Sequence, residues 1–125
     1  MASGDVLSHI GRMILSPDDV RVQREGCAAI CSIARDATRL RAVLASDGMA
    51  TVIAAMRRHP DDVEVQCQGC GALRSLTLDE EGRRRAATAT AQVEAAMRQH
   101  SADAKVQSNG CGTIQGFAFS EEART

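Results

Sequence analysis

Cysteine is the residue type in this chain that could most readily support chemistry, and two of its five cysteines stand at a spacing used for it. The sequence C-Q-G-C from Cys67 to Cys70 has the C-x-x-C spacing of zinc knuckles and redox motifs. A zinc site needs further ligands, and neither a second C-x-x-C nor a pair of histidines lies near it in the sequence. We therefore predict packing roles and no metal site, with a redox or metal-binding role of Cys67 and Cys70 left open as an alternative.

Histidine and aspartate recur at places where helices should end and begin. His59 and His100 stand at the ends of two apolar-periodic runs, where a cation complements the helix dipole. Asp18 and Asp61 each precede a second aspartate, at positions suited to capping the next helix. No glycine-rich phosphate loop follows a strand, and no serine has a recognisable neighbouring base. We therefore expect structural roles for these residues, no cofactor and no enzymatic activity.

A six-residue pattern, V-Q-x-x-G-C, organises the whole chain. Its copies begin at Val22, Val65 and Val106, a period of about 42 residues, which is typical of stacked-repeat architectures. Apolar residues at helical spacing precede each copy over residues 6–15, 49–58 and 92–99. Another helix should run through each copy of the pattern, to about residues 35, 78 and 119. Shorter helices should cover residues 36–45 and 79–88, so that a full repeat has a short helix first and the pattern on its third helix. The chain is therefore predicted to be all-α.

The repeat also predicts which side chains are buried. Glycine inside a helix costs about 1 kcal/mol relative to alanine, so the glycine of each copy indicates a close helix crossing. Cys27, Cys70 and Cys111 share one repeat position, where a small thiol behaves as an apolar side chain. Cys31 and Cys67 align with polar residues in other copies. We expect these two to be labelled first and the other three to be buried.

Composition excludes several classes of partner. The net charge is −1, and the basic run at residues 83–85 lies beside Glu80 and Glu81 in a chain without Trp or Tyr. This favours a solvated helix face over a nucleic-acid site. No apolar run is long enough to span a membrane, and no secretory signal is visible. An odd number of cysteines without an export signal favours the cytoplasm or another reducing intracellular compartment.

Three helices in about 42 residues, with a methionine (Met13, Met56, Met97) late in the second helix and the six-residue pattern on the third, resemble the armadillo repeat. The resemblance covers nearly the whole chain and implies a right-handed armadillo-like α-solenoid of about three repeats in a single domain, residues 1–125. The expected units are residues 1–35, which lack the short helix, 36–78 and 79–119. Residues 120–125 would begin another short helix or form a tail.

In the armadillo family the third helices line a concave groove that binds extended peptides or partner helices. Members that bind basic transport signals carry a Trp and, four residues later, an Asn on this helix. The matching residues are Ala28 and Ser32, Gly71 and Ser75, Gly112 and Gly116. Because these residues cannot form such ladders, we do not expect recognition of nuclear-import signals. The small residues predict a groove that admits a partner helix or tight loop close to the backbone.

The resemblance therefore implies a non-catalytic protein-protein interaction module that inserts into no membrane. The predicted groove comprises Gln23, Arg24, Ala28, Ser32, Gln66, Cys67, Gly71, Arg74, Ser75, Gln107, Ser108, Gly112, Gln115 and Gly116.

The alternative is a small structural subunit of a larger multiprotein assembly. It would contact its neighbours through uncapped ends, at Ile10, Ile14, Phe117 and Phe119. A fragment of a longer protein, a complete subunit, which Met1 favours, and open head-to-tail stacking all stay open.

Overall fold

The computed structural model describes the backbone of residues 2–124 and the side chains of residues 6–116, and this part of the chain is helical with no strand. The all-α prediction is therefore confirmed. The α-helices are α1 (Ala2–Leu15), α2 (Val20–Ile33), α3 (Ala37–Ala45), α4 (Gly48–Arg58), α5 (Val63–Leu76), α6 (Glu80–Ala86), α7 (Thr90–Gln99) and α8 (Ala104–Arg124), with a 3₁₀ turn, Ala87–Ala89, between α6 and α7.

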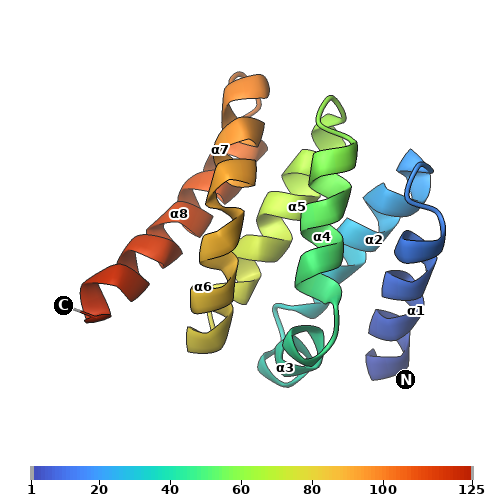
Figure 1. Cartoon of the computed structure of the whole chain (residues 1–125), viewed down its shortest axis with the longest axis horizontal. Coiled ribbons are helices and arrows are strands. Elements are labelled where there is room, and N and C mark those ends of the chain that lie inside the picture. Colours follow the sequence, from blue (N-terminus) through green and yellow to red (C-terminus); the bar gives the residue numbers. More distant parts are fainter. Residues whose placement is uncertain (1, 125) are drawn as a thin grey trace.

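The helices form two rows that cross each other (Figure 1). One row contains α1, α4 and α7, which stand side by side, and the other contains α2, α5 and α8. Each helix of the first row packs against the helix that follows it in the chain, and α5 packs against both α2 and α8. The short helices α3 and α6 connect one crossing pair to the next.

Aspartates begin most of these helices, as the sequence predicts. The Asp19 carboxylate accepts hydrogen bonds from the backbone N–H groups of Arg21 and Val22 at the start of α2. Asp62 and Asp103 bind the third N–H group of α5 and α8 in the same way. Such caps satisfy N–H groups that have no partner inside the helix, so they set where each helix starts.

Each crossing pair is held by a methionine that lies against a glycine. A Cβ atom added to Gly26 would lie 2.2 Å from Met13 Sδ, and one added to Gly69 would lie 2.6 Å from Met56 Cγ. Gly110 meets Met97 Sδ at 2.5 Å in the same position. Because glycine has no side chain, the flexible methionine thioether can fill the space where the two helices cross. This confirms the close approach expected there.

The glutamine of each pattern bonds to the end of the preceding helix. Gln23 Nε2 donates to the carbonyl oxygens of Met13 and Ser16, at 3.0 and 2.9 Å. Gln66 does the same with Met56 and His59, at 3.0 and 2.9 Å. The last carbonyl groups of a helix lack N–H partners within it, so one side chain satisfies two buried or half-buried acceptors and fixes the turn between the helices.

Polar side chains also join one crossing pair to the next. The His59 ring lies 2.8 Å from the Pro17 carbonyl oxygen, through Nε2, and His100 contacts the Pro60 oxygen in the same way. Arg58 Nε donates to Asp18 over 2.6 Å. The histidines do stand at helix ends, as predicted, but their rings bind the turn of the preceding pair rather than their own helix.

Two expectations about the ends are wrong. The sequence predicts that the last long helix ends near residue 119 and that residues 120–125 begin a short helix or form a tail, yet α8 continues to Arg124. The short helices α3 and α6 pack against later helices, and no later helix follows α8 in the described chain. Ile10, expected at an exposed end, is buried because this α1 side chain packs against the start of α4, near Gly48.

Replacing Gln66 by Leu should lower the free energy of unfolding by about 2 kcal/mol, because two carbonyl groups lose their donor while the side-chain volume changes little. Urea unfolding followed by circular dichroism would measure this. Gln68→Leu is the matched control, since the Gln68 amide donates to the exposed Glu64 carboxylate and not to a buried carbonyl group. Equal effects of the two substitutions would show that the buried bonds of Gln66 do not stabilise the fold.

Replacing Gly69 by Ala should destabilise the protein by about 1 to 2 kcal/mol, because the new methyl group displaces the buried Met56 side chain by more than the gain in helix propensity offsets. Gly11→Ala should instead stabilise it by about 0.5 to 1 kcal/mol, since no atom lies within 4 Å of a Cβ added there. Thermal unfolding would compare the two, and a shift of the same sign in both would contradict the close crossing.

Candidate functional site

The row formed by α2, α5 and α8 contains a hollow of about 230 Å³ that brings together part of the predicted groove. Gly71, Arg74 and Ser75 of α5 meet residues from both neighbouring helices there. The remaining lining residues are Cys31, Arg35, Leu78 and Asn109. Residues more than 70 positions apart are thus in one place only because α5 packs between α2 and α8.

The charged side chains that line this hollow are two arginines. Arg35 and Arg74 are both exposed, and none of the described residues that line the hollow is acidic. Burial raises the pKa of the Cys31 thiol, and the hydrogen bond and charge of Arg35 oppose that rise. Asn109 is held in place because its Nδ2 donates to the Cys67 carbonyl oxygen over 3.1 Å. The arrangement presents two guanidinium groups beside an exposed apolar side chain, Leu78.

Three glutamines of the predicted groove direct their amide groups toward the preceding helix and not into a groove. Gln23 and Gln66 are 2% exposed, and their amide groups bond to the preceding helix. Gln107 makes the same pair of bonds, to Met97 and His100. The prediction that these glutamines bind a partner is therefore wrong, because their amide groups already bond to the preceding helix and turn. A polar residue that recurs on a helix can bond to the turn before that helix as readily as it can line a groove.

The small residues of the predicted stripe are also occupied from within the chain. A Cβ atom added to Gly112 would lie 2.4 Å from Arg74 Nε, and one added to Gly116 would lie 2.6 Å from Thr77 Cβ. Gly71 would meet Cys31 Sγ at 2.9 Å. The missing side chains make room for neighbouring helices of this chain, so they do not leave the open path along the backbone that the sequence predicts.

The rest of the predicted groove is divided between exposed and buried positions. Arg24, Ser32, Arg74, Ser108 and Gln115 are exposed, Ala28 is half-buried, and Ser75 and Cys67 are buried. Arg24 is also engaged, because its Nε donates to Asp62 over 3.0 Å and lowers the pKa of that carboxyl group.

Sequence reasoning missed Arg35, Leu78 and Asn109. Arg35 and Leu78 occupy equivalent positions just after α2 and α5, which is the signal that could have revealed them.

Four of the five cysteines are buried, which disfavours the reactive thiolate form of these four. Burial raises the pKa of Cys27 and of Cys70 to about 12. Burial also raises the pKa of Cys67. The expectation that Cys31 and Cys67 are labelled before Cys111 is contradicted, because both are buried and Cys111 is exposed. Cys111, expected to be buried like its counterparts, is exposed because no helix of the described chain covers that face of α8. Within residues 6–116, no group of three or more potential metal-ligating side chains is found.

The basic run in α6 is less solvated than expected. Arg83 donates to the Thr77 carbonyl oxygen and Arg85 to that of Leu44, and both side chains are half-buried. Arg84 pairs with Glu81. Two of the three charges therefore satisfy backbone acceptors.

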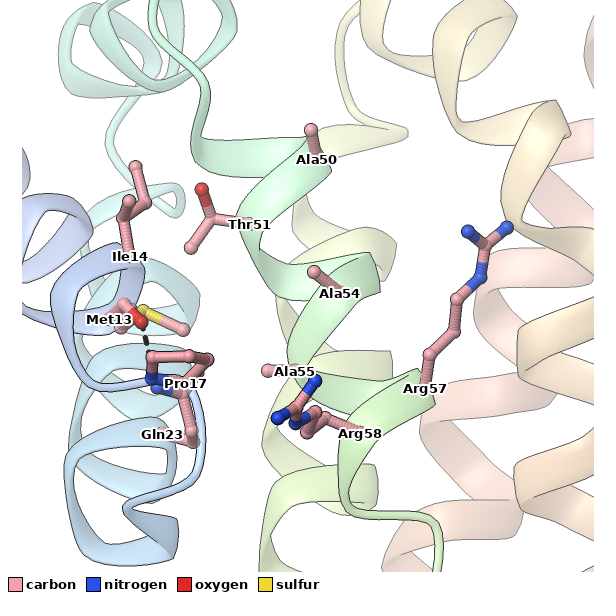
Figure 2. A pocket seen from close by; sticks show the side chains of 10 residues that line it. All are labelled: Met13, Ile14, Pro17, Gln23, Ala50, Thr51, Ala54, Ala55, Arg57 and Arg58. Carbon is pink, nitrogen blue, oxygen red and sulfur yellow. Dashed lines mark hydrogen bonds between the residues drawn. The ribbon is translucent and has the colours of Figure 1, made fainter.

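A larger hollow of about 600 Å³ lies between α1 and α4 (Figure 2). Ile14 lines it and is 55% exposed, so this predicted end residue lies between two helices. Arg58 points back toward α1, whereas Arg57 points away from it. Phe117 and Phe119 lie outside the residues whose side chains are described.

No family model, curated protein or solved structure matches this chain. No helix in the described part of the chain is both long enough and apolar enough to cross a membrane.

In dilute solution, iodoacetamide should modify Cys111 first, because it is the exposed cysteine of the five. Cys31 and Cys67 should react more slowly, and Cys27 and Cys70 only after unfolding, because the thiolate is the reactive form and burial suppresses it. Peptide mapping by mass spectrometry would give the order. Cys111→Ser should remove the fast reaction, whereas fast labelling of Cys27 or Cys70 would contradict the packing described.

Proposed function

We propose that the chain is an armadillo-like solenoid of about three repeats that acts as a non-catalytic protein-interaction module in a reducing compartment. The threefold recurrence of the methionine, glutamine and glycine contacts supports the repeat assignment. The two crossing rows support a solenoid, since α4 lies between α1 and α7 in one row and α5 lies between α2 and α8 in the other. The five free thiols are compatible with a reducing environment.

One observation carries the binding proposal: the hollow between α2, α5 and α8 exposes two arginines without an acidic residue in its described lining. Guanidinium groups bind carboxylates through paired hydrogen bonds. The partner is therefore a peptide or helix that places an acidic side chain between Arg35 and Arg74 and an apolar side chain on Leu78. Because the small residues are already covered, this partner crosses the surface at the arginines and does not enter deeply.

Binding of a fluorescein-labelled peptide with alternating Glu and Leu would test this by anisotropy. Arg74→Glu should weaken binding about tenfold or more, because it replaces attraction by repulsion. Arg98→Glu, on the exposed side of α7, is the control with the same change in net charge and should leave the affinity nearly unchanged. Equal binding of a peptide with Gln in place of Glu, or equal loss in both variants, would refute the proposal.

The alternative, a structural subunit of an assembly, is favoured by a different observation. The exposed apolar side chains of α1 include Leu7 and Leu15, which are 63% and 84% exposed. Exposed apolar side chains that gather on one helix suggest contact with another protein surface. This contact would involve the end of the helix rows and leave the arginine hollow accessible.

A further inference from the structure

The exposed side chains of α1 lie on the face that this fold uses to join its pairs. Leu7, Gly11 and Leu15 are spaced by four residues and so share one face. Their repeat equivalents in α4 are Ala50, Ala54 and Arg58, which line the hollow against α1. Figure 2 shows Arg58 directed toward α1. The face that α4 turns toward the preceding pair is therefore the face that α1 leaves uncovered.

The opposite end leaves the complementary face uncovered. Cys27 and Cys70 are fully buried, whereas Cys111 at the same position of α8 is exposed. Met13 and Met56 are buried, whereas Met97 is only half-buried. The two ends thus expose the two halves of the contact that already occurs twice inside the chain.

The side chains at these two ends also match each other. Inside the chain, Asp18 pairs with Arg58, and at the equivalent place Asp61 pairs with Gln99. The next pair in this register would join Ala102 at one end to Leu15 at the other. Both members of the polar pair are replaced together by apolar residues, so stacking there would bury no unpaired charge.

The contact between the histidines and the preceding turn also has a counterpart in this register. His59 and His100 bind carbonyl oxygens of the preceding turn, at Pro17 and Pro60. In the continued register the Ser16 hydroxyl group would face the Ser101 carbonyl oxygen, to which it can donate.

A further contact of the register is polar and matched. Arg24 binds the capping Asp62, and Cys67 and Asp103 occupy the equivalent positions at the next junction inside the chain. Between two copies these positions would hold Ser108 and Asp19, a donor and an acceptor.

We propose that a second copy of this chain docks head to tail, with its α1 and α2 on the α7 and α8 end of the first. The contact is heterologous, so each added copy leaves a new free end and the assembly grows with concentration. Stacking and peptide binding use different surfaces, because the arginine hollow lies between helices of one copy.

Charge exchange at the matched pair gives a direct test by light scattering and sedimentation of the 125-residue chain over about 10 to 500 µM. The unchanged chain should form a series of oligomers that grows with concentration. Leu15→Arg should weaken association about tenfold, because an unpaired charge enters the contact. Adding Ala102→Asp should restore it, since the Asp18 and Arg58 pair is then reproduced between copies. Leu15 and Ala102 are exposed, so both variants should fold.

Cys111 reports the same contact by its rate of alkylation. In head-to-tail stacking this rate should fall as the protein concentration rises, and Leu15→Arg should abolish the fall. A chain that stays monomeric over the whole range would overturn the proposal. So would oligomers in which Cys111 reacts at an unchanged rate, because a symmetrical contact between two α1 helices leaves α8 uncovered. Leu15→Arg should bind the Glu and Leu peptide with the affinity of the unchanged chain. Loss of stacking can therefore be distinguished from loss of peptide binding.

Discussion

The close contact between a methionine thioether and a glycine backbone is the constraint on which the rest of this structure depends. It occurs as Met13 on Gly26, Met56 on Gly69 and Met97 on Gly110. Because the chain is almost without aromatic residues, its core cannot be filled by large rings and must bring helices close together. The glutamine three residues before the glycine then fixes the turn, so one short sequence sets both the distance and the connection of two helices.

Contacts between successive pairs follow a different rule. Within a pair the same residues recur, but between pairs their partners vary while remaining matched: Asp18 with Arg58, then Asp61 with Gln99. The histidines that bind Pro17 and Pro60 recur because they bind backbone, which every repeat offers. The same residue therefore recurs in each repeat where its side chain bonds to backbone. Where two side chains meet near solvent, the residues differ between repeats but still pair with each other.

The sequence predicted the helices well and the groove poorly, for one physical reason. Helix positions follow from periodicity, from aspartate caps and from Pro17 and Pro60, which are all local. Burial depends on which helix lies next to a residue. Cys111 shares its repeat position with Cys27 but not its neighbours, so one is exposed and the other buried.

The same limit explains the glutamines and the small residues. A repeated Gln on a third helix appears polar and available in sequence, and its bonds to the preceding turn appear only when the crossing is formed. Gly112 and Gly116 were expected to leave space, and the space is filled by Arg74 and Thr77. Arg74, which lies against Gly112, also lines the hollow with Arg35, and no acidic residue is among the described residues that line it. The shallow contact with an acidic partner that we propose is consistent with this packing, because side chains of the chain itself already fill the space beside these glycines.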